Sequence, residues 1–404
     1  MEWPTLEDIE AARKRLAGVA HHTPVTPSST FSEQTGADII LKLENLQRTG
    51  SFKIRGASNK IQTLPADVRA RGVVAASAGN HAQGVALAAR LAGIPAVIVM
   101  PERASLAKAE AVRGYGAELF LHGKDYNEAE AKAKEIGAQR GMSFVHAFDD
   151  PAVMAGQGTL GLEILDDVPD VDTVVIPVGG GGLISGTALA IKAKRPNVRI
   201  VAVEPSGAAK LPDSLHKGSI QTLPGVNTIA DGLATRRVGA LPFEVIQKHV
   251  ALSVQVDDDD IATAILLLLE RAKTLVEGAG GAALAALLAG KIPVRAGEKV
   301  VVVCSGGNID VTLLDQILQR GLAKTGRVLR IATVLDDRPG ALRDLLTHIA
   351  TTGANVESIE HDRAQLNVAL GKSQVRLRLD TRGPAHIDSV LAELAARGYK
   401  VSRE

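Results

Sequence analysis

The segment Thr173-Val174-Val175-Ile176-Pro177-Val178-Gly179-Gly180-Gly181-Gly182-Leu183 decides the fold class of this chain. A short apolar run, four glycines and a helical pattern predict a strand buried on both faces, a tight loop and a helix. The backbone N–H groups of such a loop can surround an anion at the start of the helix. The loop lacks the Lys-Ser/Thr pair of a nucleotide-binding loop and the GxGxxG spacing, so it predicts a cradle for one phosphate. The alternative is a tight turn without a ligand, but four glycines in a row cost backbone entropy.

Short apolar runs alternate with helical patterns on both sides of this segment. Thr5 and Asp8 form a capping-box pattern that predicts the start of the first helix. Continuous apolar strands separated by helices are typical of parallel sheets covered on both faces, and two groups of them predict an α/β fold with two lobes. Ligands of such folds bind beyond the carboxyl ends of the strands. The expected strands are 39–43, 73–76, 96–100, 118–121, 143–146, 173–176, 200–203 and 300–303, with helices such as 105–113 and 126–139 between them.

The periodicity changes near residue 325, where we predict a linker over residues 322–326. The pattern beyond it predicts elements in the ferredoxin-like order βαββαβ. We therefore expect two domains, 1–325 and 326–404. The expected strands of the second are 328–334, 354–361, 374–380 and 400–402, and its expected helices are 341–351 and 385–397.

Composition excludes several classes of protein. The length of 404 residues predicts two or three domains. There are 46 Lys and Arg residues against 45 Asp and Glu, and the net charge of +1 gives no electrostatic reason to bind nucleic acid or an anionic membrane. Six Phe, three Tyr and one Trp leave little for base stacking. The single cysteine, Cys304, excludes an intrachain disulfide and a cysteine-based metal site, and we expect it to be a buried apolar residue.

The sequence predicts a cytoplasmic protein. Residues 1–8 are acidic and lack the apolar core of a signal peptide. The run 173–191 carries no charge and has the length of a membrane span, but Pro177 and the glycines interrupt it. A strand, a loop and the start of a helix explain this run better than a membrane segment.

Lys53 is the first candidate for chemistry outside the glycine loop. It stands at the start of a helical pattern in Thr49-Gly50-Ser51-Phe52-Lys53-Ile54-Arg55-Gly56-Ala57, between Phe52 and Ile54. Apolar surroundings lower the proton affinity of a lysine, which can then act as a nucleophile or a base. Taken alone, the position is more often that of a solvated surface lysine.

Two more loops stand between a strand and a helix. Small residues in 75–84 expose N–H groups to a carboxylate, and Ser77 and Asn80 can add hydrogen bonds, although either side chain can also be a simple helix cap. His81 is interpreted as a structural histidine rather than a catalyst. In 303–308, the hydroxyl of Ser305 can meet a ring nitrogen, or it can cap a helix expected over 309–319.

In this order the lysine, the small-residue loop, the phosphate loop and Ser-Gly-Gly-Asn resemble the fold type II family of pyridoxal-phosphate enzymes, in its threonine dehydratase and serine racemase branch. The resemblance covers about residues 5–320, and within that range residues 22–25 and 229–232 also resemble this branch. It implies a tryptophan synthase β-like fold, with a smaller lobe of about residues 47–150 inserted in the larger one and pyridoxal 5'-phosphate between them. It implies that Lys53 is the Schiff-base and catalytic lysine. The implied cofactor contacts are Lys53, Phe52, Asn80, Gly179, Gly180, Gly181, Gly182, Leu183, Gly232, Glu277 and Ser305, and the implied substrate contacts are Ser77, Ala78, Gly79, Asn80 and His81.

The resemblance also implies the reaction, which is loss of water from L-threonine followed by release of 2-oxobutanoate and ammonia. L-Serine would give pyruvate in the same way. A neutral Ser305 beside the ring nitrogen implies a moderate electron sink, which favours elimination over transamination. The alternatives are a serine racemase or another enzyme of this fold and, from a different class, an amino-acid sensor without activity, against which Lys53 argues. Whether the role is isoleucine biosynthesis or catabolism stays open.

Two residues depart from the pattern of the resembling enzymes. Racemases carry a serine where this chain has Ala78, and alanine has no proton to deliver to the opposite face of the α-carbon. Members that bind a divalent cation use two acidic residues and a carbonyl, and this chain has Glu204 and Ala208 but Lys210 at the third position. We therefore predict no tightly bound Mg²⁺ or Ca²⁺ there, and a monovalent ion stays open. Residues 257–260, all Asp, are predicted to be the acidic start of a helix over 261–273 rather than a metal site.

Residues 326–404 resemble an ACT domain, a regulatory module that binds amino acids. Its turn at 336–342 resembles the loop that precedes the first helix of that module, where N–H groups would hold an effector carboxylate. Asn355 would hold the effector's amine, and Gly353 would leave room. The resemblance implies an amino-acid effector and a homo-oligomer, a dimer or a tetramer. The alternative is a dimerisation module without a ligand.

Overall fold

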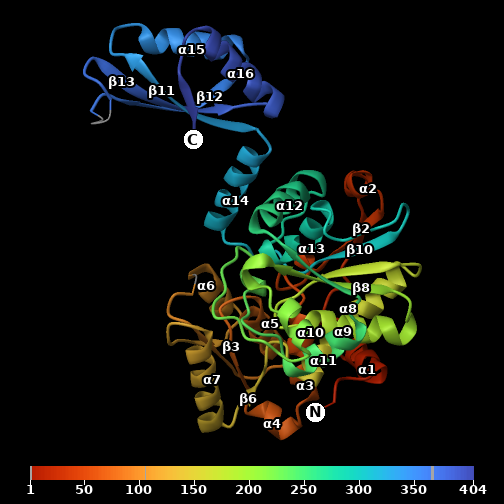
Figure 1. The fold of residues 1–404 in the computed structure, drawn as a ribbon. Coiled ribbons are helices and arrows are strands. Elements are labelled where there is room, and N and C mark those ends of the chain that lie inside the picture. The colour runs from red at the N-terminus through yellow and green to blue at the C-terminus, as the bar shows by residue number, and fades with distance from the viewer. Residues whose placement is uncertain (1, 105, 365–367) are drawn as a thin grey trace. The chain divides into compact units, whose positions relative to one another are not determined.

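The computed structural model describes residues 2–104, 106–364 and 368–404 (Figure 1). Contacts within the chain divide it into two units, Met1–Leu313 and Leu314–Glu404, which are described separately. The two units differ in kind, because the first is built on parallel strands and the second on antiparallel ones.

The larger sheet of the first unit has six strands in the order β1-β2-β10-β7-β8-β9. Its neighbours pair in parallel except β1, an edge strand that runs antiparallel to β2. The prediction of parallel sheets is thus confirmed, but the short β1 and the half-buried β9 were not predicted. Their bounds are β1 (Val25–Pro27), β2 (Asp38–Leu43), β7 (Thr173–Pro177), β8 (Arg199–Pro205), β9 (Leu252–Val256) and β10 (Lys299–Cys304).

The smaller sheet has four parallel strands in the order β5-β4-β3-β6. It lies within the residues predicted for the smaller lobe, and β6 is shorter than expected. The strands are β3 (Val73–Ala76), β4 (Ala96–Met100), β5 (Glu118–Leu121) and β6 (Ser143–Phe144). The helices that precede or join them are α3 (Lys53–Thr63), α4 (Ala66–Ala70), α5 (Asn80–Leu91), α6 (Leu106–Gly114) and α7 (Tyr126–Arg140).

Local signals start some of the remaining helices of the first unit. The capping box predicted at Thr5 and Asp8 is present, and Asp150 caps α8 ahead of Pro151. The predicted acidic helix start is confirmed, although α12 begins at Asp258, three residues earlier than expected. These helices are α1 (Leu6–Leu16), α2 (Ser29–Thr35), α8 (Pro151–Asp167), α9 (Gly182–Lys194), α10 (Leu211–Lys217), α11 (Ala240–His249), α12 (Asp258–Arg271) and α13 (Gly278–Leu288), with 3₁₀ turns at Glu44–Leu46, Ser206–Ala208 and Asp231–Leu233.

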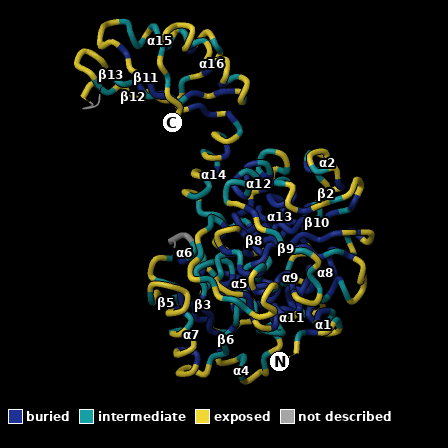
Figure 2. Tube along the Cα trace, in the orientation of Figure 1, coloured by how far each residue is buried: buried dark blue, intermediate teal, exposed yellow. Residues whose placement is uncertain are grey.

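The hydrophobic core of the first unit lies between its helices and both sheets. Figure 2 shows the trace of β8, β10 and α13 as mainly buried. The uncharged run 173–191 is β7, the glycine loop and most of α9, as predicted. No helix in the described part of the chain is both long and apolar enough to span a membrane.

The second unit contains βαββαβ in the predicted order, with sheet order β12-β13-β11-β14. All its described strand pairs are antiparallel. The predicted linker 322–326 is largely wrong, because α14 continues to Lys324 and ends only before Gly326, which has φ +70°. The elements are α14 (Val311–Lys324), β11 (Val328–Asp336), α15 (Ala341–Thr351), β12 (Asn355–Asp362), β13 (Lys372–Asp380), α16 (Pro384–Ala396) and β14 (Val401–Arg403).

Candidate active site

Lys53 is the first residue of α3, and its segment is held against the loop that follows β10. The backbone N–H of Phe52 donates to the carbonyl of Ser305 (3.2 Å), and Ser51 forms a β-bridge with Gly306. These contacts bring together two motifs that are far apart in the sequence. Lys53 is therefore positioned beside the carboxyl end of the larger sheet, where α/β folds bind ligands.

The amine of Lys53 lies in a desolvated environment. Its Nζ donates to the carbonyl of Ala147 (3.0 Å) and lies 5.1 Å from the centre of the Phe52 ring. Desolvation lowers the pKa of Lys53 to about 8, although the negative charge of Glu277 opposes the shift. An amine with this pKa loses its proton near neutral pH more readily than a solvated lysine, which suits a nucleophile or base.

The glycine loop joins β7 to the start of α9. A Cβ at Gly180 or Gly182 would crowd Phe148, and Gly181 has φ +94°, so side chains are excluded for reasons of packing and backbone conformation. The N–H groups of residues 179–183 find no acceptor elsewhere among the described residues. Unpaired donors at a helix N-terminus attract an anion, and they fit a phosphate.

Phe148 and Gly232 connect this loop to the other site residues. Phe148 follows Ala147, the acceptor of the Lys53 amine, so the glycine loop and the lysine contact adjacent residues. A Cβ at Gly179 would lie 3.0 Å from the Gly232 carbonyl, and one at Gly232 would lie 3.5 Å from Glu277 Oε1.

Leu183 is the last residue of the loop predicted to hold the cofactor phosphate. Its side chain packs into the hydrophobic core with 5% exposure, because it lies on the inner face of α9. Only its backbone is left to contact an anion at the helix start.

Asn80 lies at the centre of a hydrogen-bond chain. Its Nδ2 donates to Glu277 Oε1 (2.6 Å), and its Oδ1 accepts from Asn308 Nδ2 (2.8 Å), which also donates to the Thr49 carbonyl (2.6 Å). These hydrogen bonds fix both the nitrogen and the oxygen of the Asn80 amide. They also place Glu277, predicted only from the resemblance, in the same cluster as Lys53.

Glu277 is a buried carboxyl group whose protonation depends on pH in the physiological range. Burial and then the charge of Asp231 raise its pKa to about 7, against the Asn80 hydrogen bond, Lys108 and Lys53. Between its ordinary value of 4.5 and about 7, the folded chain keeps a proton that the unfolded chain has released. The contribution of this group to stability is therefore full below pH 4.5 and is lost as the pH rises through about 7.

We expect Glu277→Gln to remove this pH-dependent loss of folding stability in the cofactor-free protein. Between pH 4.5 and pH 7.5 the wild type should lose about 3 kcal/mol more stability than the variant. The measurement is urea unfolding of both proteins at both pH values. Equal changes in the two proteins would show that folding does not raise the pKa of Glu277.

The loop 77–81 lies between β3 and α5. The hydroxyl of Ser77 accepts from the N–H of Gly79 (3.1 Å) and so shapes the loop, and open space lies where a Cβ of Gly79 would be. Ala78 and Asn80 are half-buried. His81 is buried, its Nε2 is 2.9 Å from the Val145 carbonyl, and burial, then the charge of Lys53, lower its pKa to about 3. The histidine stays neutral, which agrees with the structural role predicted for it.

Two buried hydroxyl groups lie where the loop after β10 meets the segment before α3. Ser305 is 2% exposed, and Ser51 pairs with the neighbouring Gly306. The Ser51 hydroxyl has no hydrogen-bond partner among the described residues, which is unusual for a buried polar group and leaves it free for a ligand. Cys304 is buried as predicted, and burial raises the pKa of its thiol to about 12.

Sequence reasoning missed several residues that position this site. The sequence analysis predicts a site at 303–308 but assigns no role to the Asn308 side chain. No sequence pattern indicates Ala147 or Phe148. No local pattern marks a carbonyl that will accept from Lys53 94 residues away. The Asn308 side chain could have been found from its place in Ser-Gly-Gly-Asn at a strand end.

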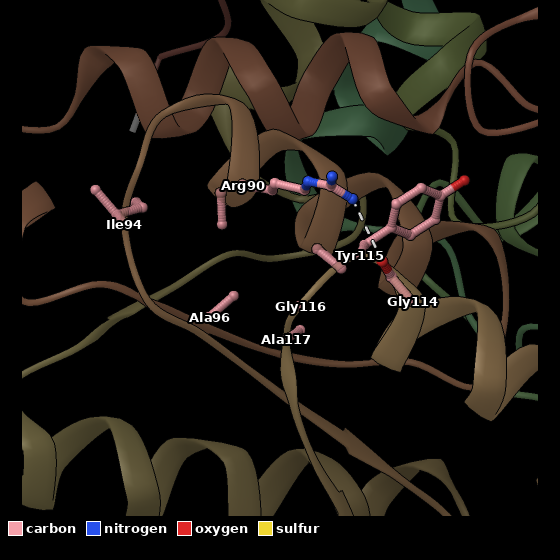
Figure 3. A pocket seen from close by; sticks show the side chains of 9 residues that line it. Arg90, Ile94, Ala96, Gly114, Tyr115, Gly116 and Ala117 are labelled. Atoms are coloured by element: carbon pink, nitrogen blue, oxygen red, sulfur yellow. Dashed lines mark hydrogen bonds between the residues drawn. The ribbon is translucent and has the colours of Figure 1, made fainter.

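A separate surface hollow of about 330 Å³ is formed by α5, the end of α6 and the segments that lead into β4 and β5 (Figure 3). It is lined by small and apolar residues with Arg90 and Tyr115, and the Arg90 side chain donates to the Gly114 carbonyl (3.3 Å). None of the predicted site residues lines it, so the hollow is distinct from the site around Lys53.

The chain belongs to the pyridoxal-phosphate dependent enzyme family, whose model matches residues 17–306. The site fits this cofactor on three observations. The unpaired N–H groups of the glycine loop suit its phosphate, the desolvated Lys53 amine suits its aldehyde, and the Ser51 hydroxyl lacks a partner. The protein is thus dependent on pyridoxal phosphate and has an α/β fold type II structure.

Named relatives narrow the class further. An L-threonine ammonia-lyase of Thermotoga maritima is 50% identical over 397 residues, which are 98% of each chain. The structure of maize serine racemase matches with a TM-score of 0.75 at 39% identity, covering 80% of this chain and 98% of that one. Threonine deaminase isoform 2 of Solanum lycopersicum matches with a TM-score of 0.74 at 38% identity, covering 79% and 90%.

Proposed function

We propose that this chain is an L-threonine ammonia-lyase that converts L-threonine to 2-oxobutanoate and ammonia, and L-serine to pyruvate and ammonia. The observation that carries the proposal is the convergence of the Lys53 amine and the glycine loop on the adjacent residues Ala147 and Phe148. The named relative at 50% identity over 98% of both chains supports the choice of substrate.

The proposed binding roles follow from the contacts of each segment. The N–H groups of residues 179–183 would hold the cofactor phosphate, with Gly232 beside them, and Phe52 and Ser305 would border the ring. Asn80, fixed by Asn308 and Glu277, would hydrogen-bond the ring hydroxyl. Residues 77–81 would bind the substrate carboxylate through backbone N–H groups of the loop.

The chemistry requires a base, an electron sink and a leaving group. Pyridoxal phosphate, when bound, supplies the sink for the electron pair left at the α-carbon. The Lys53 amine takes the α-proton, which its lowered pKa permits near neutral pH. The β-hydroxyl then leaves as water, and the released enamine hydrolyses to the 2-oxo acid and ammonia.

The direct test is a steady-state assay of the purified protein with L-threonine and with L-serine. We expect 2-oxobutanoate and ammonia in equal amounts from threonine, identified by mass. A purified, cofactor-loaded protein that releases ammonia from neither amino acid would overturn the proposal.

A racemase is the alternative that the maize structure raises, and Ala78 decides between the two. We expect L-serine to yield pyruvate with little D-serine, because Ala78 offers no proton to the second face of the α-carbon. Chiral chromatography of the reaction mixture measures both products. D-Serine formed as fast as pyruvate would mean that another group delivers the proton.

We further propose that residues 326–404, which make up most of the second unit, are an ACT domain that binds an amino-acid effector and pairs with a second copy in a homo-oligomer. Its βαββαβ order supports this. Asn355 Nδ2 donates to Asp380 (3.1 Å), and the Arg382 guanidinium donates to the Gly353 carbonyl (3.2 Å). Arg382 thus fills part of the room expected beside Gly353, and it is a second candidate to hold an effector carboxylate.

Removing residues 326–404 tests this regulatory role. A chain ending at Thr325 keeps every proposed active-site residue and is expected to deaminate threonine without responding to isoleucine or valine. The full chain should respond with a shift in threonine affinity of about 5- to 150-fold. Asn355→Ala in the full chain should weaken the response in the same direction. Identical effector responses of the truncated and full chains would contradict the regulatory role.

A further inference from the structure

Lys210 and Glu204 form a fully buried ion pair at the carboxyl end of β8. Both side chains are 0% exposed, and Lys210 Nζ lies 2.8 Å from Glu204 Oε1. The other oxygen of Glu204 accepts from the N–H of Leu211 (2.9 Å), so the carboxylate is held from both sides. Burial lowers the pKa of Lys210, and the charge of Glu204 opposes this shift.

The ammonium of Lys210 contacts two main-chain carbonyls besides Glu204. Its Nζ donates to the carbonyl of Ala208 (3.2 Å) and, at a longer distance, to that of Val178 (3.4 Å). An ammonium has three N–H bonds, so these three acceptors use all of its donors. The Lys210 ammonium thus links the carboxyl end of β8 to Val178, the residue that follows β7.

Val178 is the residue immediately before the glycine loop. Its own N–H donates to the carbonyl of Val203 (2.8 Å), and Pro177 is the register partner of Val203 in the sheet. The backbone at Val178 is therefore fixed on its N–H side by the sheet and on its carbonyl side by Lys210. The orientation of this peptide unit sets the position and direction in which the loop with the N–H groups of residues 179–183 starts.

The oxygen atoms around the Lys210 ammonium are those that a hard cation prefers. A carboxylate and main-chain carbonyls are common ligands of Ca²⁺ and, with water, of Mg²⁺. In this chain a positive charge tethered to the backbone already occupies the middle of the set. The residues therefore do not fit a divalent cation, since a second positive charge would lie beside the ammonium without a second carboxylate to offset it.

We propose that Lys210 is a positioning residue that serves as a tethered cation: its ammonium takes the place of a metal ion among Glu204, Ala208 and Val178, and holds the glycine loop ready for the cofactor phosphate. The inference rests on the proposed cofactor role of that loop. Because the Lys210 ammonium is part of the chain, the affinity for the cofactor does not depend on divalent cations.

The first experiment measures the dissociation constant of pyridoxal phosphate by titrating the cofactor-free full-length protein and following absorbance. Lys210→Met is expected to raise this constant about tenfold or more. The double variant Glu204→Gln/Lys210→Met has no unpaired buried charge, and it should bind the cofactor as weakly as the single variant. Recovery of wild-type affinity in the double variant would show that Lys210 only neutralises Glu204, and would overturn the proposal.

Lys42→Met is the matched control. Lys42 is also 0% exposed and is paired with Glu163 (2.9 Å) and Asp167 (3.1 Å), but it lies on β2, which β10 separates from the strand that leads into the glycine loop. It should lower the melting temperature and leave the cofactor dissociation constant unchanged. An equal loss of cofactor affinity in both lysine variants would mean that the effect comes from general destabilisation, and would overturn the proposal.

The second experiment replaces the tethered cation with a second carboxylate. Lys210→Asp should bind the cofactor weakly in EDTA and regain affinity with millimolar Mg²⁺ or Ca²⁺, while the wild type is indifferent to both. A wild-type dissociation constant that changes with Mg²⁺ or EDTA would overturn the proposal, and so would a folded Lys210→Asp protein that ignores the metals. The readout is cofactor binding without turnover, so the role of Lys210 is tested even if the chain fails to deaminate threonine.

Discussion

Replacing Lys53 with alanine is expected to lower the rate of threonine deamination by about 10³-fold or more while the fold is retained. The amine is the base in the proposed reaction, and the neighbouring His81 cannot replace it. His81 is close but stays neutral, and its Nε2 is engaged with the Val145 carbonyl. The measurements are the steady-state rate, the visible absorbance of the cofactor-loaded protein and the far-UV circular dichroism.

Lys60→Ala is the matched control for this experiment. Lys60 lies on the same helix, α3, but its Nζ pairs with Asp150 (2.6 Å) and its side chain is 21% exposed. Its replacement should change the rate by no more than about twofold. A Lys53→Ala protein that keeps the parent's rate and absorbance would remove Lys53 from the proposed mechanism.

Replacing Arg55 with methionine is expected to destabilise the first unit by about 3–5 kcal/mol. Arg55 is 1% exposed and lies between two buried carboxylates. Its Nε donates to Glu44 (2.8 Å), and its Nη1 and Nη2 donate to the two oxygens of Glu163 (2.6 and 2.9 Å). Removing the guanidinium leaves both carboxylates buried. Glu163 keeps Lys42 as a cationic partner, but Glu44 loses its own.

Urea unfolding of Arg55→Met and of the control Arg140→Met measures this effect. Arg140 pairs with Glu118 at the surface, where both side chains are more than 40% exposed, and its loss should cost about 0–1 kcal/mol. Equal destabilisation by the two substitutions would show that the buried network adds no more than a surface pair.

The sequence by itself determined the features whose causes lie within a few residues. The apolar run and four glycines of 173–183 predicted a strand, a loop and a helix, and the structure has β7, the loop and α9 there. Thr5 and Asp8 predicted a helix start, and Asp257 marked another. Caps and periodicity act over one or two turns, so they can be read without knowing the fold. Local pattern failed at residues 322–326, since no residue there breaks a helix before Gly326.

Only the tertiary structure decided which of these segments meet and what charge they carry. Asn80 and Asn308 are bonded across 228 residues, and Asn80 and Glu277 across 197. The pKa values of Lys53 and Glu277 depend on desolvation and on each other's charge, which arise only when the sheet places their loops together. The sequence predicted that Lys210 would repel a metal ion, but only the structure placed its ammonium on Glu204, Ala208 and Val178. The physical reason is that burial and long-range pairing follow from strand order, and no local pattern encodes the order β1-β2-β10-β7-β8-β9.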